Sequence, residues 1–229
     1  MHRYIKGIET HNRIKRMRNL YYIAIEGPIG VGKTSLVKLM GEKLSARTIL
    51  EQFEENPFLA DFYDDPERFA FQTQLYFLLQ RYQQQQELRQ VDIFHNLLVT
   101  DYMFVKDRLF ASLNLNEKEM ALYETVANLL ERNVINPDLV IYLQADTDTL
   151  MKNIHKRKRS FEKNMSRDYI DALNQVYNEY FFRYQDTPLL IINTNNIDFV
   201  NNPKDLEEII NVVRKPITGT KFFNPATGF

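Results

Sequence analysis

The sequence predicts an α/β fold in which a five-stranded parallel sheet carries helices on both faces. Short apolar runs rich in β-branched residues alternate with longer segments of helical periodicity. A glycine-rich loop joins the first of these runs to the first helix. A chain of 229 residues that is 44% hydrophobic is also long enough to bury a sizeable core in one domain.

The glycine-rich loop fits the pattern G-x-x-x-x-G-K-[ST] at every fixed position. With the serine after it, the loop comprises Gly27, Pro28, Ile29, Gly30, Val31, Gly32, Lys33, Thr34 and Ser35. In such a loop the backbone N–H groups and the start of the next helix bind phosphates, the lysine reaches the β- and γ-phosphates, and the hydroxyl ligates Mg²⁺. The alternative, a glycine-rich connector with a surface lysine, does not explain the strand and helix on either side. We therefore predict a three-layer sandwich of the P-loop NTPase type.

The other elements follow in the order expected of a parallel sheet covered on both faces. The predicted strands are 20–25, 48–50, 96–101, 137–143 and 189–192. The predicted helices are 36–44, 67–90, 103–111, 116–133, 167–183 and 203–213, and a further helix from about 147 leads to the basic patch at 155–159. On the helix over 67–90, the positions expected to be buried are Phe69, Leu75, Leu78, Leu79 and Tyr82. The loops after the strands should meet at one edge of the sheet, where ligands bind.

We divide the chain into a flexible basic arm over 1–19, a P-loop domain over 20–214 and an irregular tail over 215–229. The formal net charge of −1 gives no indication of a nucleic-acid partner. No apolar run approaches the roughly 20 residues of a membrane helix. Cysteine is absent, which excludes disulfides and thiolate zinc sites and favours a cytoplasmic location.

Carboxylates follow two of the predicted strands. Asp101 ends the third strand, where it either helps to hold Mg²⁺ or caps a neighbouring segment. Glu51 follows the second strand, so it should lie beside the phosphate loop and could take the proton from an acceptor hydroxyl. Alternatively Glu51 is a solvated surface residue, and Glu54 or Glu55 serves instead.

Two further groups of polar residues could take part in such chemistry. The basic patch over 155–159 is either a solvated helix end or, as we favour, a lid whose arginines neutralise a transferring phosphoryl group. Gln74 and Arg81 are two helical turns apart, so they share one helix face at a separation of roughly 10 Å. They either point to solvent or bind the polar edge of a ligand.

Longer blocks of sequence surround these residues. They read E-Q-F-E-E-N-P-F-L at 51–59, F-Y at 62–63, F-A-F-Q-T-Q at 69–74, R-Y at 81–82, D-R-L-F-A-S at 107–112 and R-K-R-S-F-E at 157–162. In this order they resemble the deoxyribonucleoside kinase family, especially its bacterial deoxyadenosine and deoxyguanosine kinase branch, over about residues 20–213. The resemblance implies transfer of the γ-phosphoryl group of ATP, with Mg²⁺, to the 5′-hydroxyl of a purine deoxynucleoside in nucleotide salvage. Deoxycytidine is a further candidate substrate, and family members are commonly homodimers, with which the apolar helix 116–133 is compatible.

The resemblance also implies roles for individual residues on the acceptor side. Glu51 would be the base for the 5′-hydroxyl, while Tyr63 and Glu162 would hold the 3′-hydroxyl. Gln74 would hydrogen-bond the edge of the base, and Phe110 would stack on its ring.

The remaining implied roles concern base selection and the donor. Arg81 and Asp107 match the pair that family members specific for purines or cytosine carry beside the base. Arg157 and Arg159 would bind the phosphates. The segment Asp198–Phe199 is similar to the loop that borders the adenine of ATP.

One position departs from the family pattern. The family usually has D/E-R-S after the third strand, whereas this chain has Asp101, Tyr102 and Met103. The arginine expected near the 5′-hydroxyl is therefore missing, and a tyrosine supplies no fixed positive charge. Either Lys106 or Arg108 compensates, or the lid contributes more of the charge.

Two other functions fit the loop and the sheet. A nucleoside monophosphate kinase of the thymidylate type would need an arginine site for the acceptor phosphate, whereas the segment 51–81 supplies mainly carboxylates and glutamines. A regulatory NTP-binding switch would hydrolyse slowly and signal through a partner.

Overall fold

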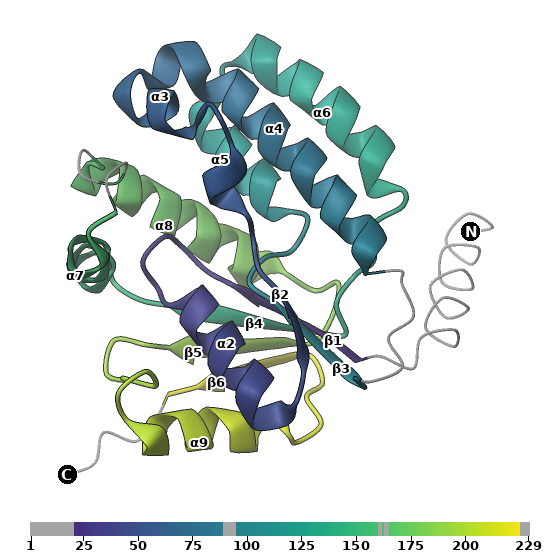
Figure 1. Cartoon of the computed structure of the whole chain (residues 1–229), viewed down its shortest axis with the longest axis vertical. Helices are drawn as coiled ribbons and strands as arrows, with labels where there is room; N and C mark the ends of the chain where they lie inside the picture. The colour runs from purple at the N-terminus through teal and green to yellow at the C-terminus, as the bar shows by residue number, and fades with distance from the viewer. Residues whose placement is uncertain (1–20, 89–94, 160–161, 163–164, 225–229) are drawn as a thin grey trace.

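A six-stranded parallel sheet lies between layers of helices (Figure 1). The computed structural model describes residues 21–88, 95–159, 162 and 165–224, so the basic arm over 1–19 lies outside the described residues. The strands are β1 (Tyr21–Glu26), β2 (Arg47–Ile49), β3 (Leu97–Thr100), β4 (Leu139–Gln144), β5 (Leu189–Asn193) and β6 (Thr220–Phe223). Their spatial order is β2-β3-β1-β4-β5-β6, and every neighbouring pair is parallel.

The helices cover both faces of this sheet (Figure 1). They are α2 (Lys33–Leu44), α3 (Leu59–Asp64), α4 (Pro66–Glu87), α5 (Lys106–Asn114), α6 (Glu117–Glu131), α7 (Thr147–Arg157), α8 (Arg167–Arg183) and α9 (Pro203–Val213). Helices α2 and α9 pack on one face and α8 and α5 on the other, with α4 and α6 stacked outside α5. Within the described residues, no helix has both the length and the hydrophobicity of a transmembrane span.

The five predicted strands and the predicted helices are present, with ends shifted by a few residues. Helix α4 begins with Pro66 in its first turn, and the side chain of Asp65 accepts a hydrogen bond from the backbone N–H of Arg68 at 3.3 Å. The turn η1 (Phe53–Glu55) and the short helix α3 lie in a segment for which the sequence indicated no element.

The expectation of a five-stranded sheet and an irregular tail is wrong at residues Thr220–Phe223. These residues form β6, whose Thr220 aligns with Leu189 of β5 in a parallel pairing. The side chains of β6 are mostly exposed because it is an edge strand, so no buried alternation marks it in the sequence. Residues 225–229 lie outside the described part of the chain.

Burial on α4 corrects one further expectation. Leu78 is 1% exposed and packs in the core between α4, α5 and α6. Leu79, which the periodicity placed among the buried positions, is instead 48% exposed. It therefore lies on the outer surface of the molecule.

The sheet is apolar on both faces, as a covered parallel sheet requires. In β1, Ile23 and Ile25 face the core under α2 and α9, whereas Tyr22 and Ala24 face the core under α8. All four side chains are at most 1% exposed. Because every side chain of this strand except the first is buried, β1 is held rigidly beneath the glycine-rich loop.

An aromatic stack joins the sheet to α8. The rings of Tyr142 on β4 and Phe181 on α8 lie 4.4 Å apart between centroids, with an angle of 17° between their planes. Phe181 is 1% exposed, while its neighbour Phe182 is 87% exposed. The two phenylalanines thus differ in burial while sharing one helix.

We expect Phe181→Ala to lower the free energy of unfolding by about 3–5 kcal/mol, because it removes a buried ring and leaves a cavity. Phe182→Ala is the matched control and should change this free energy by about 0.5 kcal/mol or less. Urea denaturation followed by circular dichroism measures both. Equal effects of the two substitutions would contradict the packing described here.

Candidate active site

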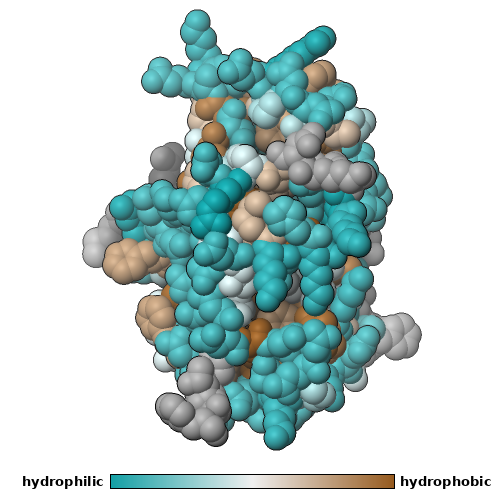
Figure 2. All heavy atoms as spheres, turned by 90° about the vertical axis from the view of Figure 1, so that its left-hand side faces the viewer, coloured by the Kyte–Doolittle hydropathy of each residue, from teal (hydrophilic) through white to brown (hydrophobic). Residues whose placement is uncertain are grey.

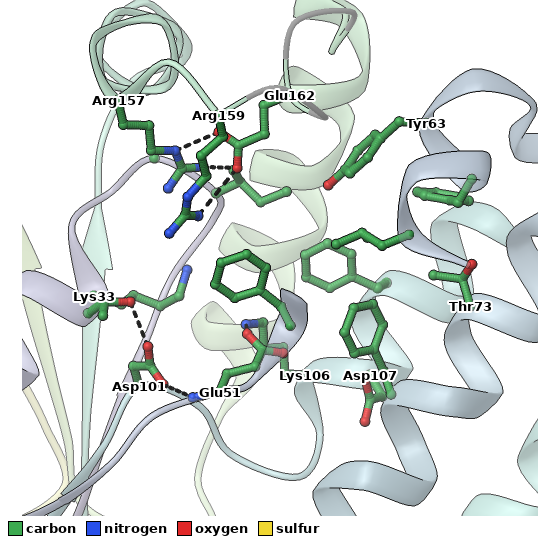
Figure 3. Close-up of a pocket in the computed structure, with 18 of the residues that line it drawn as sticks. Lys33, Glu51, Tyr63, Thr73, Asp101, Lys106, Asp107, Arg157, Arg159 and Glu162 are labelled. Atoms are coloured by element: carbon green, nitrogen blue, oxygen red, sulfur yellow. Dashed lines mark hydrogen bonds and ion pairs between the residues drawn. The ribbon is translucent and has the colours of Figure 1, made fainter. Parts of the chain in front are cut away.

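A cavity of about 370 Å³ opens at the carboxyl edge of the sheet, between the glycine-rich loop and helices α3, α4 and α5 (Figure 3). The predicted site residues that line it are Ile29, Gly30, Gly32, Lys33, Thr34, Ser35, Glu51, Tyr63, Gln74, Arg81, Asp101, Asp107, Phe110, Arg157, Arg159 and Glu162. The structure therefore brings together residues from six segments of the chain.

The side of the molecule that carries α7 is largely hydrophilic, with apolar atoms visible between the polar ones (Figure 2).

The glycine-rich loop needs glycine where it passes close to other backbone. Gly27 has φ +149°, and a Cβ there would lie 2.5 Å from the carbonyl oxygen of Leu143. A Cβ on Gly30, which has φ +89°, would lie 2.7 Å from the carbonyl oxygen of Leu150. Side chains at these positions would push the loop away from β4 and α7. The cavity is lined by other residues of the loop and not by Gly27, Pro28 and Val31.

Lys33 extends along the loop from the first turn of α2. Its Nζ donates hydrogen bonds to the carbonyl oxygens of Gly27 at 2.7 Å and Pro28 at 3.0 Å. Burial and the neighbouring charge of Lys106 lower the pKa of Lys33 to about 7. A polyphosphate bound in the loop would favour the charged ammonium again, since an opposite charge raises the pKa of a lysine.

Asp101 connects the loop to Glu51. Its Oδ2 accepts a hydrogen bond from Thr34 Oγ1 at 2.6 Å, and its Oδ1 accepts one from the backbone N–H of Glu51 at 2.7 Å. It therefore contacts both the phosphate loop and the segment that begins at Glu51, and its role in holding Mg²⁺ stays a prediction. A hydroxyl beside a carboxylate fits Mg²⁺, which takes few protein oxygens when it also binds phosphates and water. Among the described residues, no group of three or more His, Cys, Asp or Glu side chains could hold a metal by itself.

Glu51 is held by two cations. Arg81 Nη2 contacts one carboxylate oxygen and Lys106 Nζ the other. Burial alone would raise the pKa of Glu51, but the charges of Arg81 and Lys106 outweigh it and lower this pKa to about 2. The carboxylate is therefore ionised at neutral pH. Glu54 and Glu55 are exposed and do not line the cavity.

Gln74 and Arg81 line the cavity and do not point to solvent, which excludes one of the two alternatives that the sequence left open. They are 1% and 3% exposed. Arg81 also forms an ion pair with Asp107 on α5. Gln74 Oε1 and Asp107 Oδ2 are buried without a hydrogen-bond partner among the described residues. Because such atoms cost stability when unpaired, they are acceptors available to a ligand.

Aromatic and aliphatic side chains form the walls around these polar groups. Phe110 was predicted here, and the structure adds Phe53, Leu59, Phe62 and Phe77. A hydrophobic slot with a few polar atoms is the usual form of a site for a small uncharged ligand. Phe53, Leu59 and Phe62 stand in the sequence blocks at 51–59 and 62–63, although no individual role was predicted for them. Phe77 lies outside these blocks, and its periodicity equals that of a core position.

At the upper rim, two arginines pair with one glutamate (Figure 3). Arg157 Nε and Nη2 each lie 2.6 Å from the carboxylate of Glu162, and Arg159 Nη1 lies 3.5 Å from it. The guanidinium of Arg159 also lies 4.4 Å from the ring centroid of Phe53. Residues 160–161 of this predicted lid lie outside the described part.

Two tyrosines, Tyr63 on α3 and Tyr169 on α8, line the cavity together with Arg157, Arg159 and Glu162. Burial raises the pKa of Tyr63, so its phenol is neutral. Tyr169 was not among the predicted site residues, because no motif marks it. It accepts a hydrogen bond from Asn114 Nδ2 at 3.2 Å.

Besides Gly27, Pro28 and Val31, two further predicted residues lie outside the cavity. Phe199 is buried, and its ring lies close to Gly32, where it would be 2.9 Å from an added Cβ. Asp198 is exposed and bonds to Asn201. Neither lines the cavity, so their role at the adenine of ATP stays a prediction.

The structure also distinguishes between Lys106 and Arg108, the two cations that could replace the missing family arginine. Lys106 lines the cavity and contacts Glu51. Arg108 instead pairs with Glu124 and Glu131 on α6, outside the cavity. Lys106 is therefore the cation that reaches the site.

Comparison with known proteins agrees with this geometry. The profile of the family described as deoxynucleoside kinase matches residues 23–218. Deoxyguanosine kinase of Bacillus subtilis is 32% identical over 210 residues, which cover 88% of this chain and 100% of the relative. Deoxyadenosine kinase of Lactobacillus acidophilus is 31% identical over 202 residues, which cover 82% and 92% respectively.

A solved structure of deoxyadenosine kinase from M. mycoides with bound dATP has a TM-score of 0.75 and 26% identity, and the match covers 85% of this chain and all of that chain. The resemblance found in the sequence is thereby confirmed. With a family profile that spans most of its length and relatives above 30% identity, this chain belongs to the deoxynucleoside kinase family.

Proposed function

We propose that the protein transfers the γ-phosphoryl group of ATP to the 5′-hydroxyl of a purine deoxynucleoside, with deoxycytidine as a further candidate substrate. One observation supports this most directly. Glu51 lies between the phosphate loop and a pocket lined by aromatic rings and unpaired buried polar atoms. Asp101 connects it to the loop through hydrogen bonds with Thr34 and with the backbone N–H of Glu51. A hydroxyl placed against Glu51 would therefore lie beside a triphosphate bound by Lys33.

In this mechanism Lys33 and the loop amides bind the β- and γ-phosphates. Thr34 and Asp101 would hold Mg²⁺, which neutralises phosphate charge when bound. The acceptor oxygen bonds to the γ-phosphorus, the bond to the bridging oxygen of ADP breaks, and the hydroxyl proton passes to Glu51. Because the transition state is loose, positioning and charge contribute more than the basicity of the carboxylate.

The ion pairs of the lid suggest how its side chains would exchange partners when substrates bind. In the structure, Arg157 and Arg159 are paired with Glu162. Phosphates compete for these guanidinium groups, since arginine binds phosphate and carboxylate with similar geometry. Glu162 would then be available, together with Tyr63, for the 3′-hydroxyl of the sugar.

Recognition of the base would depend on the buried polar atoms of α4 and α5. Gln74 Oε1 and Asp107 Oδ2 have no partner among the described residues, and Arg81 fixes the position of Asp107. A base that offers no donor would leave these atoms unpaired, which penalises it strongly. The names of the relatives, deoxyguanosine kinase and deoxyadenosine kinase, support purines as the substrates.

We also propose a homodimer that packs through α4 and α6. Leu79 on α4 and Leu122 and Leu129 on α6 are 48%, 54% and 59% exposed, and the last two lie seven residues apart on one helix face. The combined substitution Leu122→Glu and Leu129→Glu should convert the dimer to a monomer in sedimentation velocity. Phe182→Glu on α8 is the control and should leave the dimer intact. A wild-type monomer would refute the proposal.

The phosphotransferase is tested by ATP consumption with each deoxynucleoside, each monophosphate and no acceptor. We expect purine deoxynucleosides to stimulate it, whereas a thymidylate-type kinase would need monophosphates and a regulatory switch would need no acceptor. Glu51→Gln should lower turnover by about 10²–10⁴-fold while ATP binding is retained. The exposed Glu55→Gln is the matched control. Normal turnover of Glu51→Gln would exclude the assigned base.

Substrate selection is tested at α4 and α5. We expect Arg81→Met and Asp107→Asn to lower the ratio of kcat/KM for purine deoxynucleosides over thymidine by about tenfold or more, because each removes a charged partner of the base. Arg81→Met should also lower turnover, since Arg81 contacts Glu51. Steady-state kinetics with the substrate panel gives both values. An unchanged ratio in Asp107→Asn would contradict a role in reading the base.

A further inference from the structure

Lys106 occupies a position that protein stability alone does not favour. It is the first residue of α5, where the helix dipole disfavours a cation, and it is 6% exposed. Lysine is rarely buried without a partner, and here the partner is Glu51. Residues that break such local rules are expected at functional sites.

The ammonium of Lys106 has spare hydrogen-bonding capacity on the cavity side. An ammonium carries three N–H donors, and within the described part of the chain its one recorded acceptor is Glu51 Oε2. Lys106 lines the cavity and approaches the ring of Phe110, 5.9 Å from its centroid. The remaining donors are therefore available to a ligand that lies against Glu51.

Lys106 and Lys33 reach the same part of the cavity from two different helices (Figure 3). Both side chains line the cavity, Lys33 from the first turn of α2 and Lys106 from the first turn of α5. A phosphoryl group that lies between these two cations would be stabilised by both charges. Lys33 marks the donor side of such a group and Lys106 the acceptor side.

From this geometry we infer that Lys106 is a catalytic residue of phosphoryl transfer, which contacts the γ-phosphoryl group as it moves from ADP to the hydroxyl held by Glu51. The inference rests on the proposed function. The acceptor oxygen forms its bond to phosphorus, the bridging oxygen leaves with ADP, and Glu51 takes the hydroxyl proton. Lys106 keeps its own protons and stabilises negative charge on the transferred oxygens.

A purely structural role for Lys106 makes a different prediction. Arg81 is shared between Glu51 and Asp107, so Lys106 could serve only to satisfy the second oxygen of Glu51. A glutamine amide at position 106 would still offer an N–H donor to that oxygen but no charge. Lys106→Gln therefore separates a hydrogen-bonding role from a role of the positive charge.

The experiment compares Lys106→Met, Lys106→Gln and Lys106→Arg with Arg108→Met in the full-length enzyme. Arg108 is the matched control because it is a cation on the same helix whose partners, Glu124 and Glu131, lie outside the cavity. The measurements are kcat and KM for the purine deoxynucleoside that wild type uses best, the Kd for ATP, and the melting temperature.

We expect Lys106→Met and Lys106→Gln to lower kcat by about 10²–10³-fold, the usual effect of removing one donor to a charged transition state. KM and the ATP Kd should stay within about threefold, and Lys106→Arg should recover at least about tenfold of the lost kcat, because it restores the charge. Arg108→Met should retain kcat within about twofold, as expected of a substitution outside the site.

Near-normal kcat in Lys106→Gln would overturn the inference, as would a loss confined to KM. Should Lys106→Met fail to fold, the comparison of Lys106→Gln with Lys106→Arg decides the question alone: a kcat that does not differ between them contradicts a role of the charge. A wild-type enzyme that phosphorylates no nucleoside would refute the proposed function instead, so the two failures are distinguishable.

Discussion

The structure depends on one partly buried chain of polar contacts that joins two halves of a site. Thr34 donates to Asp101, Asp101 accepts the backbone N–H of Glu51, and the Glu51 carboxylate binds cations from α4 and α5. Because each contact is partly removed from water, it is stronger than the same contact at the surface but also more costly to leave incomplete. Displacing any one member would therefore move the others.

The sheet topology makes this chain possible. Strand β3 lies between β1 and β2, and all three run in parallel, so the glycine-rich loop, Asp101 and Glu51 leave the sheet at the same edge. The helices then close the site from the other side, because α4 and α5 pack against each other above this edge. A rigid sheet thus positions the half that we propose to bind phosphates, and helix packing positions the half that we propose to bind the uncharged acceptor.

Charged side chains of the site pair with one another. Arg81 is shared by Glu51 and Asp107, while Arg157 and Arg159 share Glu162. Pairing of this kind keeps buried charges from being isolated, which would cost roughly several kcal/mol for each ion. In the proposed mechanism, phosphate and hydroxyl groups of the substrates would replace some of these contacts.

The sequence by itself determined the phosphate loop, the first five strands and the placement of Glu51 and Asp101, because these follow from short-range patterns: glycines at fixed spacing, apolar runs, and carboxylates at strand ends. Only the tertiary structure decided that Gln74 faces the cavity, that Leu79 faces outward, that Lys106 and not Arg108 reaches Glu51, and that an edge strand β6 follows α9. The reason is that helical periodicity groups residues on a face without saying what that face meets, and an exposed edge strand carries no buried alternation. Which partner a polar side chain finds is set by packing between segments far apart in the chain.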